Sequence, residues 1–540
     1  MLTLENTFAN PTAVADAGYQ APHQFLILGL GESGVAMAKW CLRNGAAVRL
    51  VDTRDRSQFS TLQLAWLAEL EFSGLKDMQF GPLSDDLLTD IDVVGISPGL
   101  SPLQEPTESF LVKARKARVD VWSEIEFFAR AIAAMARMAE EKQSSYSTSV
   151  LAITGTNGKT TTTALTGQLC ERAGKKVAVA GNISPAALDK LMTCLDGADQ
   201  IEDMPDVWVL ELSSFQLVYT DSLNATAATV LNITQDHLDW HGDMSAYATA
   251  KAKIFGPDTI CILNRDDPVV MGLIADEQKA EKLIVTFGSN RPDEQGAFGI
   301  EHDLRAGGID WLVWAEVDED VEPKPKRRRK SVAIEEDEPL RLKRLIPADA
   351  LRIRGRHNAL NALAALALAR AANLPMNVLL HGLRDYHGEP HRVQSIAIVN
   401  DVEYVDDSKG TNVGATVAAL NGLASNESGK RIWLIAGGDG KGQDFSPLRE
   451  PALRFVKGVF LIGKDAAKVA EAMGADIPCV NSRDLQAAVQ AAAAKAVSGD
   501  LVLLSPACAS LDQFRDYKER AQVFVSEVEE LGMRFEGVQA

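Results

Sequence analysis

Short apolar runs, glycine-containing turns and amphipathic stretches follow one another along most of the chain. Helical patterns of apolar positions are visible at 35–44, about 123–140 and 358–372. The runs that we expect to be strands lie at 25–28, 47–51, 92–96, 150–153, 177–180, 207–210, 229–231, 259–263, 432–436, 458–462 and 501–504. Buried strands that alternate with helices are typical of parallel sheets covered on both faces.

The alternation restarts twice and therefore predicts three α/β domains in series. A chain of 540 residues needs several domains, because a single core rarely grows that large. We expect a Rossmann-like domain at 23–145, a central P-loop-type ATPase domain with a parallel sheet at 146–388, and a Rossmann-like C-terminal domain at 389–540. Residues 1–22 are polar without a clear period and are predicted to be a loose extension. The polar stretch 141–149 is a predicted linker.

Composition favours a soluble protein that binds neither nucleic acid nor membranes. Acidic residues outnumber basic ones, 74 to 55, and the net charge of −19 repels polyanions. The basic run 324–330 is flanked by acids, so we predict a solvated, disordered insertion at 318–339. The six cysteines form no CxxC pair, and no secretory signal or membrane-spanning run is visible. These features predict a reduced, cytoplasmic protein without structural zinc.

The sequence Gly155-Thr156-Asn157-Gly158-Lys159-Thr160-Thr161 follows the apolar run 150–153 and opens a predicted helix. Glycines let backbone N–H groups converge on phosphate oxygens, and the helix N-terminus adds partial positive charge. Lys159 can bridge the β- and γ-phosphates, and the Thr160 hydroxyl can hold Mg²⁺. Ile153 stands where the first glycine of the usual P-loop pattern would be, so the loop is shorter than in common P-loop enzymes. The segment predicts ATP binding.

Another glycine turn, Gly29-Leu30-Gly31-Glu32-Ser33-Gly34, lies between the first strand and helix, and Asp52 closes the next strand. This G-x-G-x-x-G pattern suits a diphosphate at a helix N-terminus but does not choose between NAD and a UDP-linked molecule. The glycines could also serve only close strand–helix packing.

Polar residues follow other predicted strands of the central domain. Glu211 comes directly after the run 207–210, and Asp236-His237 follows the run 229–231. A carboxylate at the carboxyl end of a strand beside the phosphate loop is well placed for Mg²⁺, and His237 could be a second ligand or a structural histidine. Composition alone makes Lys251 a surface charge. Lys441 lies in a glycine-rich turn, where an ammonium can face a ligand carboxylate.

Together these segments resemble the Mur ligase family of peptidoglycan synthesis. The resemblance rests on the phosphate loop, Glu211–Leu217, Asp236-His237, His357–Asn361 and Glu389–Arg392. Two further segments, Asp407–Asn412 and Ser505–Phe514, are similar to the branch of the family that adds D-glutamate. The motifs occur in the family's order over about residues 24–535.

The resemblance implies an ATP-dependent ligase. ATP would phosphorylate the alanine carboxylate of UDP-N-acetylmuramoyl-L-alanine, and D-glutamate would attack the resulting acyl phosphate. Such a reaction needs mainly positioning and charge neutralisation. The resemblance further implies two Mg²⁺ ions and a carbamylated Lys251, and we expect a monomer with only small-molecule substrates.

The resemblance also implies roles for individual residues. The expected catalytic residues are Lys159, Glu211, His237 and Lys251, and the expected metal ligands are Thr160, Glu211, His237 and Lys251. Expected ATP contacts are Gly155, Thr156, Asn157, Gly158, Lys159, Thr160, Thr161, Asn358, Asn361, Arg392 and Asp407. Expected contacts of the UDP-linked substrate are Glu32, Ser33, Asp52, Thr53, Arg54, Gly99 and Asn182. Expected D-glutamate contacts are Lys409, Thr411, Lys441, Ser510, Leu511 and Tyr517.

Three other functions fit parts of the sequence. Another Mur ligase or a folylpolyglutamate-synthase-like enzyme would use a different amino-acid nucleophile. An NAD-dependent oxidoreductase would explain the first glycine turn but leave the phosphate loop without a purpose. A non-catalytic nucleotide-binding regulator would bind ATP without amino-acid-dependent phosphate release.

Overall fold

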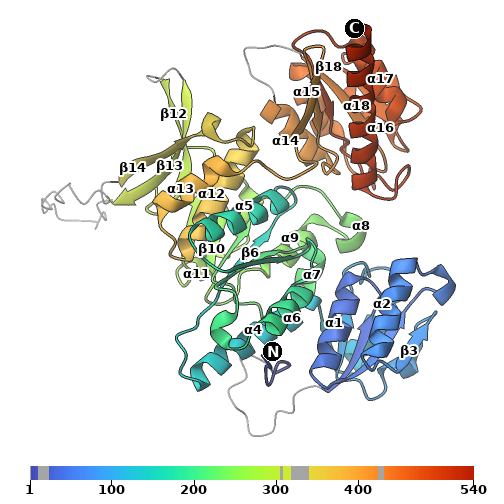
Figure 1. The fold of residues 1–540 in the computed structure, drawn as a ribbon, viewed down its shortest axis with the longest axis vertical. Coiled ribbons are helices and arrows are strands. Elements are labelled where there is room, and N and C mark those ends of the chain that lie inside the picture. The colour runs from blue at the N-terminus through green and yellow to red at the C-terminus, as the bar shows by residue number, and fades with distance from the viewer. Residues whose placement is uncertain (1, 10–22, 305–307, 318–339, 424–430, 540) are drawn as a thin grey trace, which may run out of the picture.

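The structure is a computed structural model that describes residues 2–9, 23–304, 308–317, 340–423 and 431–539. Three sheets follow one another along the chain, one in each of three domains (Figure 1). The predicted insertion at 318–339 lies outside the described residues. Within the described ranges, no helix is long and apolar enough to cross a membrane.

The first sheet has the parallel strand order β3-β2-β1-β4-β5. Its order reverses between β1 and β4, which in a doubly wound fold marks the ligand-binding crevice. The elements are β1 (Gln24–Leu28), α1 (Glu32–Arg43), β2 (Ala47–Asp52), α2 (Thr61–Phe72), β3 (Asp77–Phe80), β4 (Val93–Ile96), α3 (Thr107–Lys116), β5 (Asp120–Trp122) and α4 (Glu124–Glu141).

The central sheet has nine strands in the order β14-β13-β12-β11-β10-β9-β6-β8-β7. Its strands are β6 (Ser149–Thr154), β7 (Val177–Gly181), β8 (Val207–Glu211), β9 (Ala227–Val230), β10 (Ile260–Asn264), β11 (Ile284–Phe287), β12 (Phe298–Asp303), β13 (Ile309–Val317) and β14 (Leu340–Pro347). Only the β12–β13 and β13–β14 pairs are antiparallel. Alternate residues of β6 enter two apolar clusters on opposite faces, so the sheet is buried on both sides.

Helices of the central domain pack on these two faces. Helix α5 follows the phosphate loop and packs against α12 and α13. The helices are α5 (Lys159–Arg172), α6 (Ala187–Gly197), α7 (Ser214–Val218), α8 (Leu238–His241), α9 (Met244–Ala252), α10 (Pro268–Met271), α11 (Asp276–Lys279), α12 (Arg356–Ala371) and α13 (Met376–Asp385).

The third sheet has the order β15-β16-β20-β17-β18-β19, and only β15 is antiparallel to its neighbour. Its strands are β15 (Gln394–Val399), β16 (Val402–Asp406), β17 (Ile432–Gly437), β18 (Val456–Ile462), β19 (Cys479–Asn481) and β20 (Leu501–Leu504). Its helices are α14 (Val413–Leu423), α15 (Arg449–Phe455), α16 (Ala466–Met473), α17 (Leu485–Lys495) and α18 (Tyr517–Gln539).

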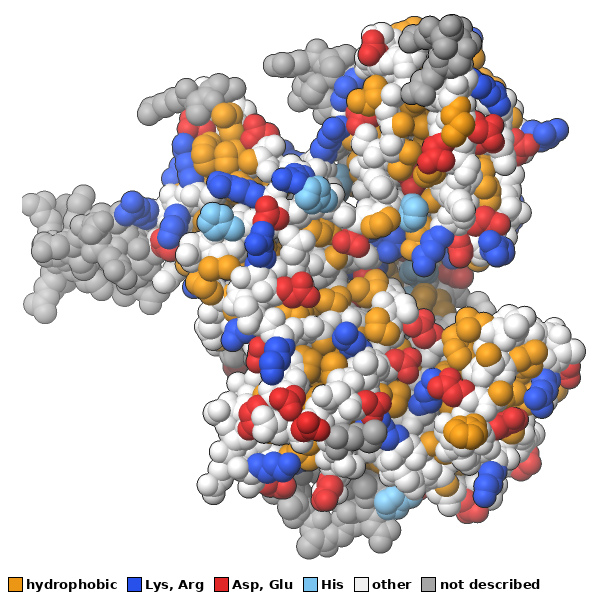
Figure 2. Space-filling model, in the orientation of Figure 1, with side chains coloured by type: hydrophobic (Ala, Val, Ile, Leu, Met, Phe, Trp, Pro, Cys, Tyr) orange, Lys and Arg blue, Asp and Glu red, His pale blue; other side chains and the backbone are white. Residues whose placement is uncertain are grey.

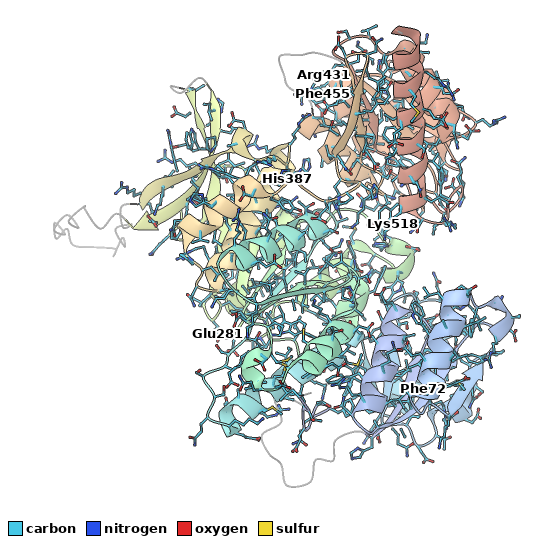
Figure 3. The ribbon with its side chains drawn as sticks, viewed as in Figure 1. Phe72, Glu281, His387, Arg431, Phe455 and Lys518 are labelled. Carbon is cyan, nitrogen blue, oxygen red and sulfur yellow. The ribbon has the colours of Figure 1, made fainter. Side chains whose placement is uncertain are left out.

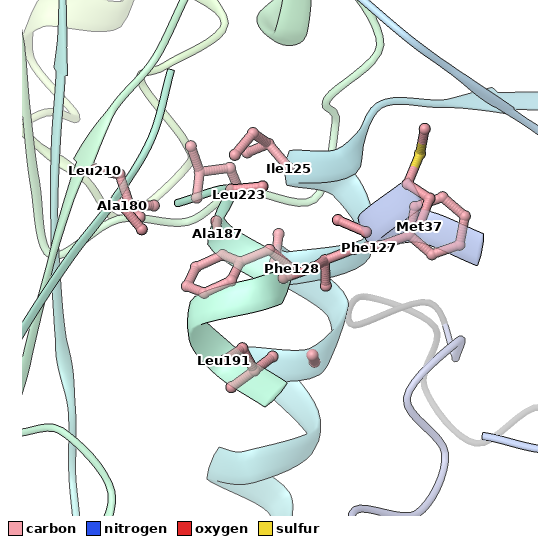
Figure 4. Packing of buried hydrophobic residues seen from close by; sticks show 14 of the residues in the cluster. Met37, Ile125, Phe127, Phe128, Ala180, Ala187, Leu191, Leu210 and Leu223 are labelled. Atoms are coloured by element: carbon pink, nitrogen blue, oxygen red, sulfur yellow. The ribbon is translucent and has the colours of Figure 1, made fainter. Parts of the chain in front are cut away.

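Helix α4 joins the cores of the first two domains. Phe127 lies near Met37 of α1, whereas Phe128 faces Leu191 of α6 (Figure 4). Consecutive residues of one helix therefore pack on different domains. The aromatic ring of Phe128 meets Trp208 of β8 at a centroid distance of 5.0 Å. This shared core fixes the first domain against the central one.

The chain's first residues differ from the predicted loose extension. The side chains of Leu2, Leu4 and Phe8 are each 6% exposed or less. The Phe8 ring lies 4.7 Å from that of Phe25, and the Phe8 carbonyl accepts a hydrogen bond from Arg130. Residues 2–9 are therefore packed instead of loose, because these three apolar side chains belong to the core cluster that the first two domains share.

The segment expected to be a linker at 141–149 also packs against its surroundings. The hydroxyls of Tyr146 and Thr148 both donate to the carbonyl of Pro205, at 2.8 and 2.9 Å. The segment therefore runs along the loop before β8 instead of standing free. The domain boundaries themselves remain predictions.

The predicted three-domain α/β architecture is confirmed by the three sheets. Each apolar run named above overlaps an observed strand. On the visible face of the molecule, basic and acidic side chains are interspersed (Figure 2).

Candidate active site

The phosphate loop lies at the carboxyl end of β6, between β8 and β9 in the sheet. Gly158 precedes α5 with a φ of 84°, a left-handed conformation that favours glycine. A Cβ at this position would also lie 2.5 Å from the Asn361 side-chain oxygen. Glycine is thus required both by backbone conformation and by the approach of α12. The first turn of α5, whose N–H groups lack helical acceptors, opens beside this loop.

Two lysines, one half-buried and one fully buried, meet at one carbonyl of the loop. The Nζ atoms of Lys159 and Lys251 donate to the Gly155 carbonyl at 2.9 and 3.0 Å. Lys251 is 1% exposed, and its Nζ lies 4.6 Å from the centroid of the Tyr247 ring. Burial lowers the pKa of both ammonium groups, and the charge of Lys159 lowers the pKa of Lys251 further. The composition-based view of Lys251 as a surface charge was wrong.

Glu211 ends β8 with one carboxylate oxygen partnered and one unpartnered. Its Oε1 accepts a hydrogen bond from Asn182 at 2.9 Å. Its Oε2 is buried and has no hydrogen-bond partner in the structure. A buried carboxylate oxygen without a partner is costly, so a ligand that binds it would stabilise the folded protein.

His237 lies before α8 in a left-handed backbone conformation with a φ of 55°. Its Nε2 is 3.5 Å from the Asp236 carboxylate, and its ring packs edge-on against Phe215 at 4.7 Å. Burial lowers the pKa of His237, and the positive charge of Lys441 acts in the same direction. A neutral imidazole is the form that can bind a metal ion.

Two cations of the C-terminal part reach the phosphate loop. Arg392 and Lys409 each donate to the Thr160 hydroxyl oxygen at 3.0 Å. The Asn412 amide donates to Asn157 at 3.0 Å and also contacts Asp236. Burial lowers the pKa of Lys409 to about 8. With Lys159, three cationic side chains therefore converge on the start of α5.

Expected ATP contacts from both domains line one small cavity of about 50 Å³. Of the expected set, its walls contain Asn157, Gly158, Thr161, Asn358, Asn361, Arg392 and Asp407. Asn361 donates to the Asn358 oxygen at 3.1 Å, so the two amides are adjacent on α12. Burial raises the pKa of Asp407 to about 7. The structure thus brings together residues that are more than 200 positions apart.

All seven expected contacts of the UDP-linked substrate line a larger cavity of about 570 Å³. They are Glu32, Ser33, Asp52, Thr53, Arg54, Gly99 and Asn182. Burial alone would raise the pKa of Asp52, but hydrogen bonds from Arg54 and from the Leu30 N–H outweigh it and hold the pKa below its ordinary value. The cavity lies between two domains. Glu32 of the first domain and Ser184 of the central domain both line it, and the Ser184 hydroxyl donates to Glu32 at 2.8 Å.

The expected D-glutamate contacts come from three connected loops of the C-terminal domain and from the first residue of α18. The backbones of Asp439 and Ala509 exchange two hydrogen bonds, which ties the Lys441 turn to the loop carrying Ser510 and Leu511. The Gly410 carbonyl accepts from Ala507, which ties in the loop carrying Lys409 and Thr411. The Lys409 Nζ lies 5.6 Å from the centroid of the Tyr517 ring. Leu511 is 68% exposed.

Several residues of this region had no role assigned from sequence. Asn412 belongs to a recognised segment, yet its contacts across the domain boundary required the fold. Asn232 accepts from the backbone N–H groups of Thr156 and Asn157 and so shapes the phosphate loop. Ser184 and Tyr247 likewise carry no motif that marks them.

The site fits Mg²⁺. Among the residues that the structure describes, no three His, Cys, Asp or Glu side chains gather as a metal-binding group. Mg²⁺ does not need one, since it is usually held by one or two carboxylates, water and substrate phosphates. The unpartnered Oε2 of Glu211 is such a carboxylate oxygen, next to the phosphate loop.

Family models match three consecutive parts of the chain. They are a Mur ligase MurD-like N-terminal domain at 23–123, a Mur ligase middle domain at 153–369 and a Mur ligase glutamate ligase domain at 391–508. The chain belongs to the Mur ligase family. Similar curated proteins include UDP-N-acetylmuramoylalanine–D-glutamate ligases of Cupriavidus metallidurans, 56% identical over 95% of this chain and 98% of that one, and of Ralstonia nicotianae, 56% identical over 92% and 95%.

Solved Mur ligases share the fold. MurF from Acinetobacter baumannii has a TM-score of 0.54 at 15% identity and covers 93% of each chain. MurF from Thermotoga maritima in complex with ADP has a TM-score of 0.53 at 17% identity and covers 94% of this chain and 95% of that one. At such low identities the likeness concerns the three-domain arrangement alone.

Proposed function

We propose that the protein is an ATP-dependent ligase that joins D-glutamate to UDP-N-acetylmuramoyl-L-alanine during synthesis of the peptidoglycan precursor. Curated relatives at 54–56% identity over more than nine-tenths of the chain carry this activity in their names. Because the chain belongs to the Mur ligase family, we reject the hypothesis of an NAD-dependent oxidoreductase. We further propose that it acts in the cytoplasm as a monomer.

The observation that supports the mechanism is that Arg392 and Lys409 both donate to the Thr160 hydroxyl, next to Lys159, whose Nζ donates to the Gly155 carbonyl of the same loop. Phosphoryl transfer to a carboxylate brings two anions together, and fixed positive charges lower that barrier. Burial disfavours the charged forms of Lys159 and Lys409, so a polyphosphate would stabilise them. Two of the cations come from the C-terminal part, which makes the ATP site depend on both domains.

Thr160, Glu211, His237 and Lys251 would hold Mg²⁺. The ions would neutralise charge on the transferring phosphate when bound. Asn182 fixes the Glu211 carboxylate through its Oε1 and leaves Oε2 available. Phe215 packs against the His237 ring and so restricts its orientation.

We propose that Lys251 is carbamylated. Carbamylation requires an uncharged amine, and burial together with Lys159 strongly lowers the pKa of Lys251. The product is a carboxylate-like group. Such an anionic group can bind Mg²⁺, whereas an ammonium would repel it. Removing bicarbonate and CO₂ should therefore lower activity reversibly, whereas full activity of a carbamate-free enzyme, verified by mass spectrometry, would refute this assignment.

The cavity between the first two domains would take the UDP part of the acceptor, with its muramoyl-alanine end directed by Asn182 towards Glu211. Asn182 both lines that cavity and binds Glu211, so it stands between the two sites. Lys409, Thr411, Lys441, Ser510, Leu511 and Tyr517 would surround D-glutamate from the C-terminal side.

Phosphate release with ATP and UDP-N-acetylmuramoyl-L-alanine tests the proposal. D-glutamate should support release, whereas L-alanine, a diamino acid or a dipeptide should not. Release that depends on one of those other nucleophiles would instead assign the chain to a different ligation step.

A further inference from the structure

The loop before β15 holds a histidine to which no role has been given. His391 Nδ1 lies 2.7 Å from Oδ2 of Asp406, the last residue of β16. Asp406 is completely buried, and its other oxygen accepts from the Ser408 N–H at 2.9 Å. The carboxylate is therefore fixed on both sides, while the His391 side chain remains 28% exposed.

The backbone around His391 is held in an unusual conformation. His391 and Val393 have φ values of 64° and 47°, a region that is strained for a β-branched residue such as valine. The His391 N–H donates to the Gln394 side chain, and its carbonyl accepts from the Lys409 N–H. The loop before β15 is thus hydrogen-bonded at His391 to the loop that contains Lys409.

The imidazole lies beside the residues proposed to surround D-glutamate. Its ring centroid is 6.3 Å from that of Tyr517, and the Lys409 ammonium lies over the same Tyr517 ring. Lys518, the neighbour of Tyr517, lies at the end of α18 that points towards the central domain (Figure 3). Because Nδ1 faces Asp406, the outer ring nitrogen, Nε2, is left to face this region.

The proposed reaction needs a proton acceptor at this place. Free D-glutamate carries an ammonium near neutral pH, and an ammonium has no lone pair with which to attack a carbonyl. An imidazole whose Nδ1–H is held by a buried carboxylate presents a basic Nε2, an arrangement that serves as a general base in other enzymes.

We propose that His391, held by Asp406, is the general base that takes a proton from the ammonium of D-glutamate. This inference rests on the proposed ligase function. The freed amine forms the C–N bond at the acyl-phosphate carbonyl. The C–O bond to phosphate then breaks, and phosphate leaves with that electron pair and the second nitrogen-bound proton. His391 returns its proton to water.

The charges around His391 suit this task. Asp406 stabilises the imidazolium that forms, and Asp407 follows it in the chain. The phenol of Tyr517 is uncharged at neutral pH. The imidazolium formed by proton transfer is therefore next to the carboxylate at the end of β16.

The test compares two nucleophiles acting on the same acyl phosphate. Hydroxylamine is uncharged near neutral pH and needs no base, whereas D-glutamate does. His391→Gln should lower the D-glutamate rate by about a hundredfold or more, the usual contribution of a general base. It should leave hydroxylamine capture at the wild-type level. His302→Gln is a matched control, because His302 forms an equally short Nδ1 contact with Asp310 far from the site.

The variant Asp406→Asn removes the charge but keeps the shape of the side chain, and its single amide oxygen can accept from His391 Nδ1–H or from the Ser408 N–H, not from both. Without the carboxylate the imidazolium is less stable, so the acid limb of the D-glutamate rate should move to lower pH. An unchanged limb would overturn the proposal. So would an unchanged D-glutamate rate in His391→Gln, or an equal loss of hydroxylamine capture, which would make the histidine a support for the loop. If the wild-type enzyme formed no acyl phosphate from ATP and the UDP-substrate, the proposed function itself would fail.

Discussion

Arg392 donates a hydrogen bond to the Thr160 hydroxyl at 3.0 Å, from the C-terminal part of the chain to the start of the phosphate helix. Lys409 reaches the same oxygen from a different loop. The cations that would neutralise the transferring phosphate are therefore supplied jointly by two domains. We therefore expect catalysis to depend on the arrangement of these two domains.

Removing either central charged group should nearly abolish turnover. Lys159→Ala and Glu211→Ala are each expected to lower kcat by at least about a hundredfold, as electrostatic groups at a reacting centre commonly do. Steady-state phosphate release measures this effect. Lys279→Ala, which removes an exposed lysine paired with Asp276, should have no effect. Near-normal rates in the first two variants would contradict the site assignment.

Lys441→Ala should impair D-glutamate binding more than ATP binding. Lys441 lies in an exposed turn that is tied to the Ser510 loop through Asp439 and Ala509. The KM for D-glutamate is expected to rise several-fold more than the KM for ATP. Measuring both constants under saturation with the other substrates decides this, and equal increases would count against the role.

Glu124 should make the folded protein less stable as the pH rises. Burial raises its pKa to about 7, and Asp189 and Glu32 add repulsion, while the Leu188 N–H partly offsets these effects. The folded state keeps its proton where the unfolded state releases it, so stability falls between about pH 4.5 and 7 and stays lower above. The upper limit is about 3 kcal/mol.

Glu124→Gln removes that titration and should flatten the pH dependence. Thermal unfolding of both proteins at about pH 5 and 8 tests this. The wild type should lose more stability than the variant between the two values. An equal loss in both would show that Glu124 is not the responsible group.

Phe8→Ala should destabilise the junction of the first two domains. Deleting a buried phenylalanine side chain typically costs about 3–5 kcal/mol. Thermal unfolding should occur at a clearly lower temperature than in the wild type. Phe72→Ala is the control, because Phe72 is 95% exposed and its removal should change little. If Phe8→Ala and Phe72→Ala unfolded alike, the N-terminal segment would not contribute to stability.

The sequence predicted the central parallel strands because those strands are buried on both faces and read as continuous apolar runs. It did not predict β3, β5, β11–β16 or β19, which lie at or towards sheet edges. Such strands are short or only partly buried, so their apolar positions are interrupted. The burial of Leu2, Leu4 and Phe8 was missed for a related reason, since three apolar residues in a polar segment form no period.

The candidate site was predictable where a local motif carries the chemistry. The loop around Lys159 needs only a strand, glycines and a helix start, all visible in sequence. The surroundings of Lys251 are the Tyr247 ring and the Gly155 carbonyl. These contacts form only in the folded protein, so no local sequence pattern reveals them. The pairing of His391 with Asp406 likewise depends on a strand that was not predicted.

Oxygen-isotope transfer tests the central claim, that ATP activates the alanine carboxylate for attack by D-glutamate. UDP-N-acetylmuramoyl-L-alanine labelled with ¹⁸O in both carboxylate oxygens would be turned over with ATP and D-glutamate, and the released phosphate analysed by mass spectrometry. Formation of an acyl phosphate and breakage of its C–O bond place one ¹⁸O in each phosphate, and only when D-glutamate is present. Unlabelled phosphate released during product formation would contradict the account.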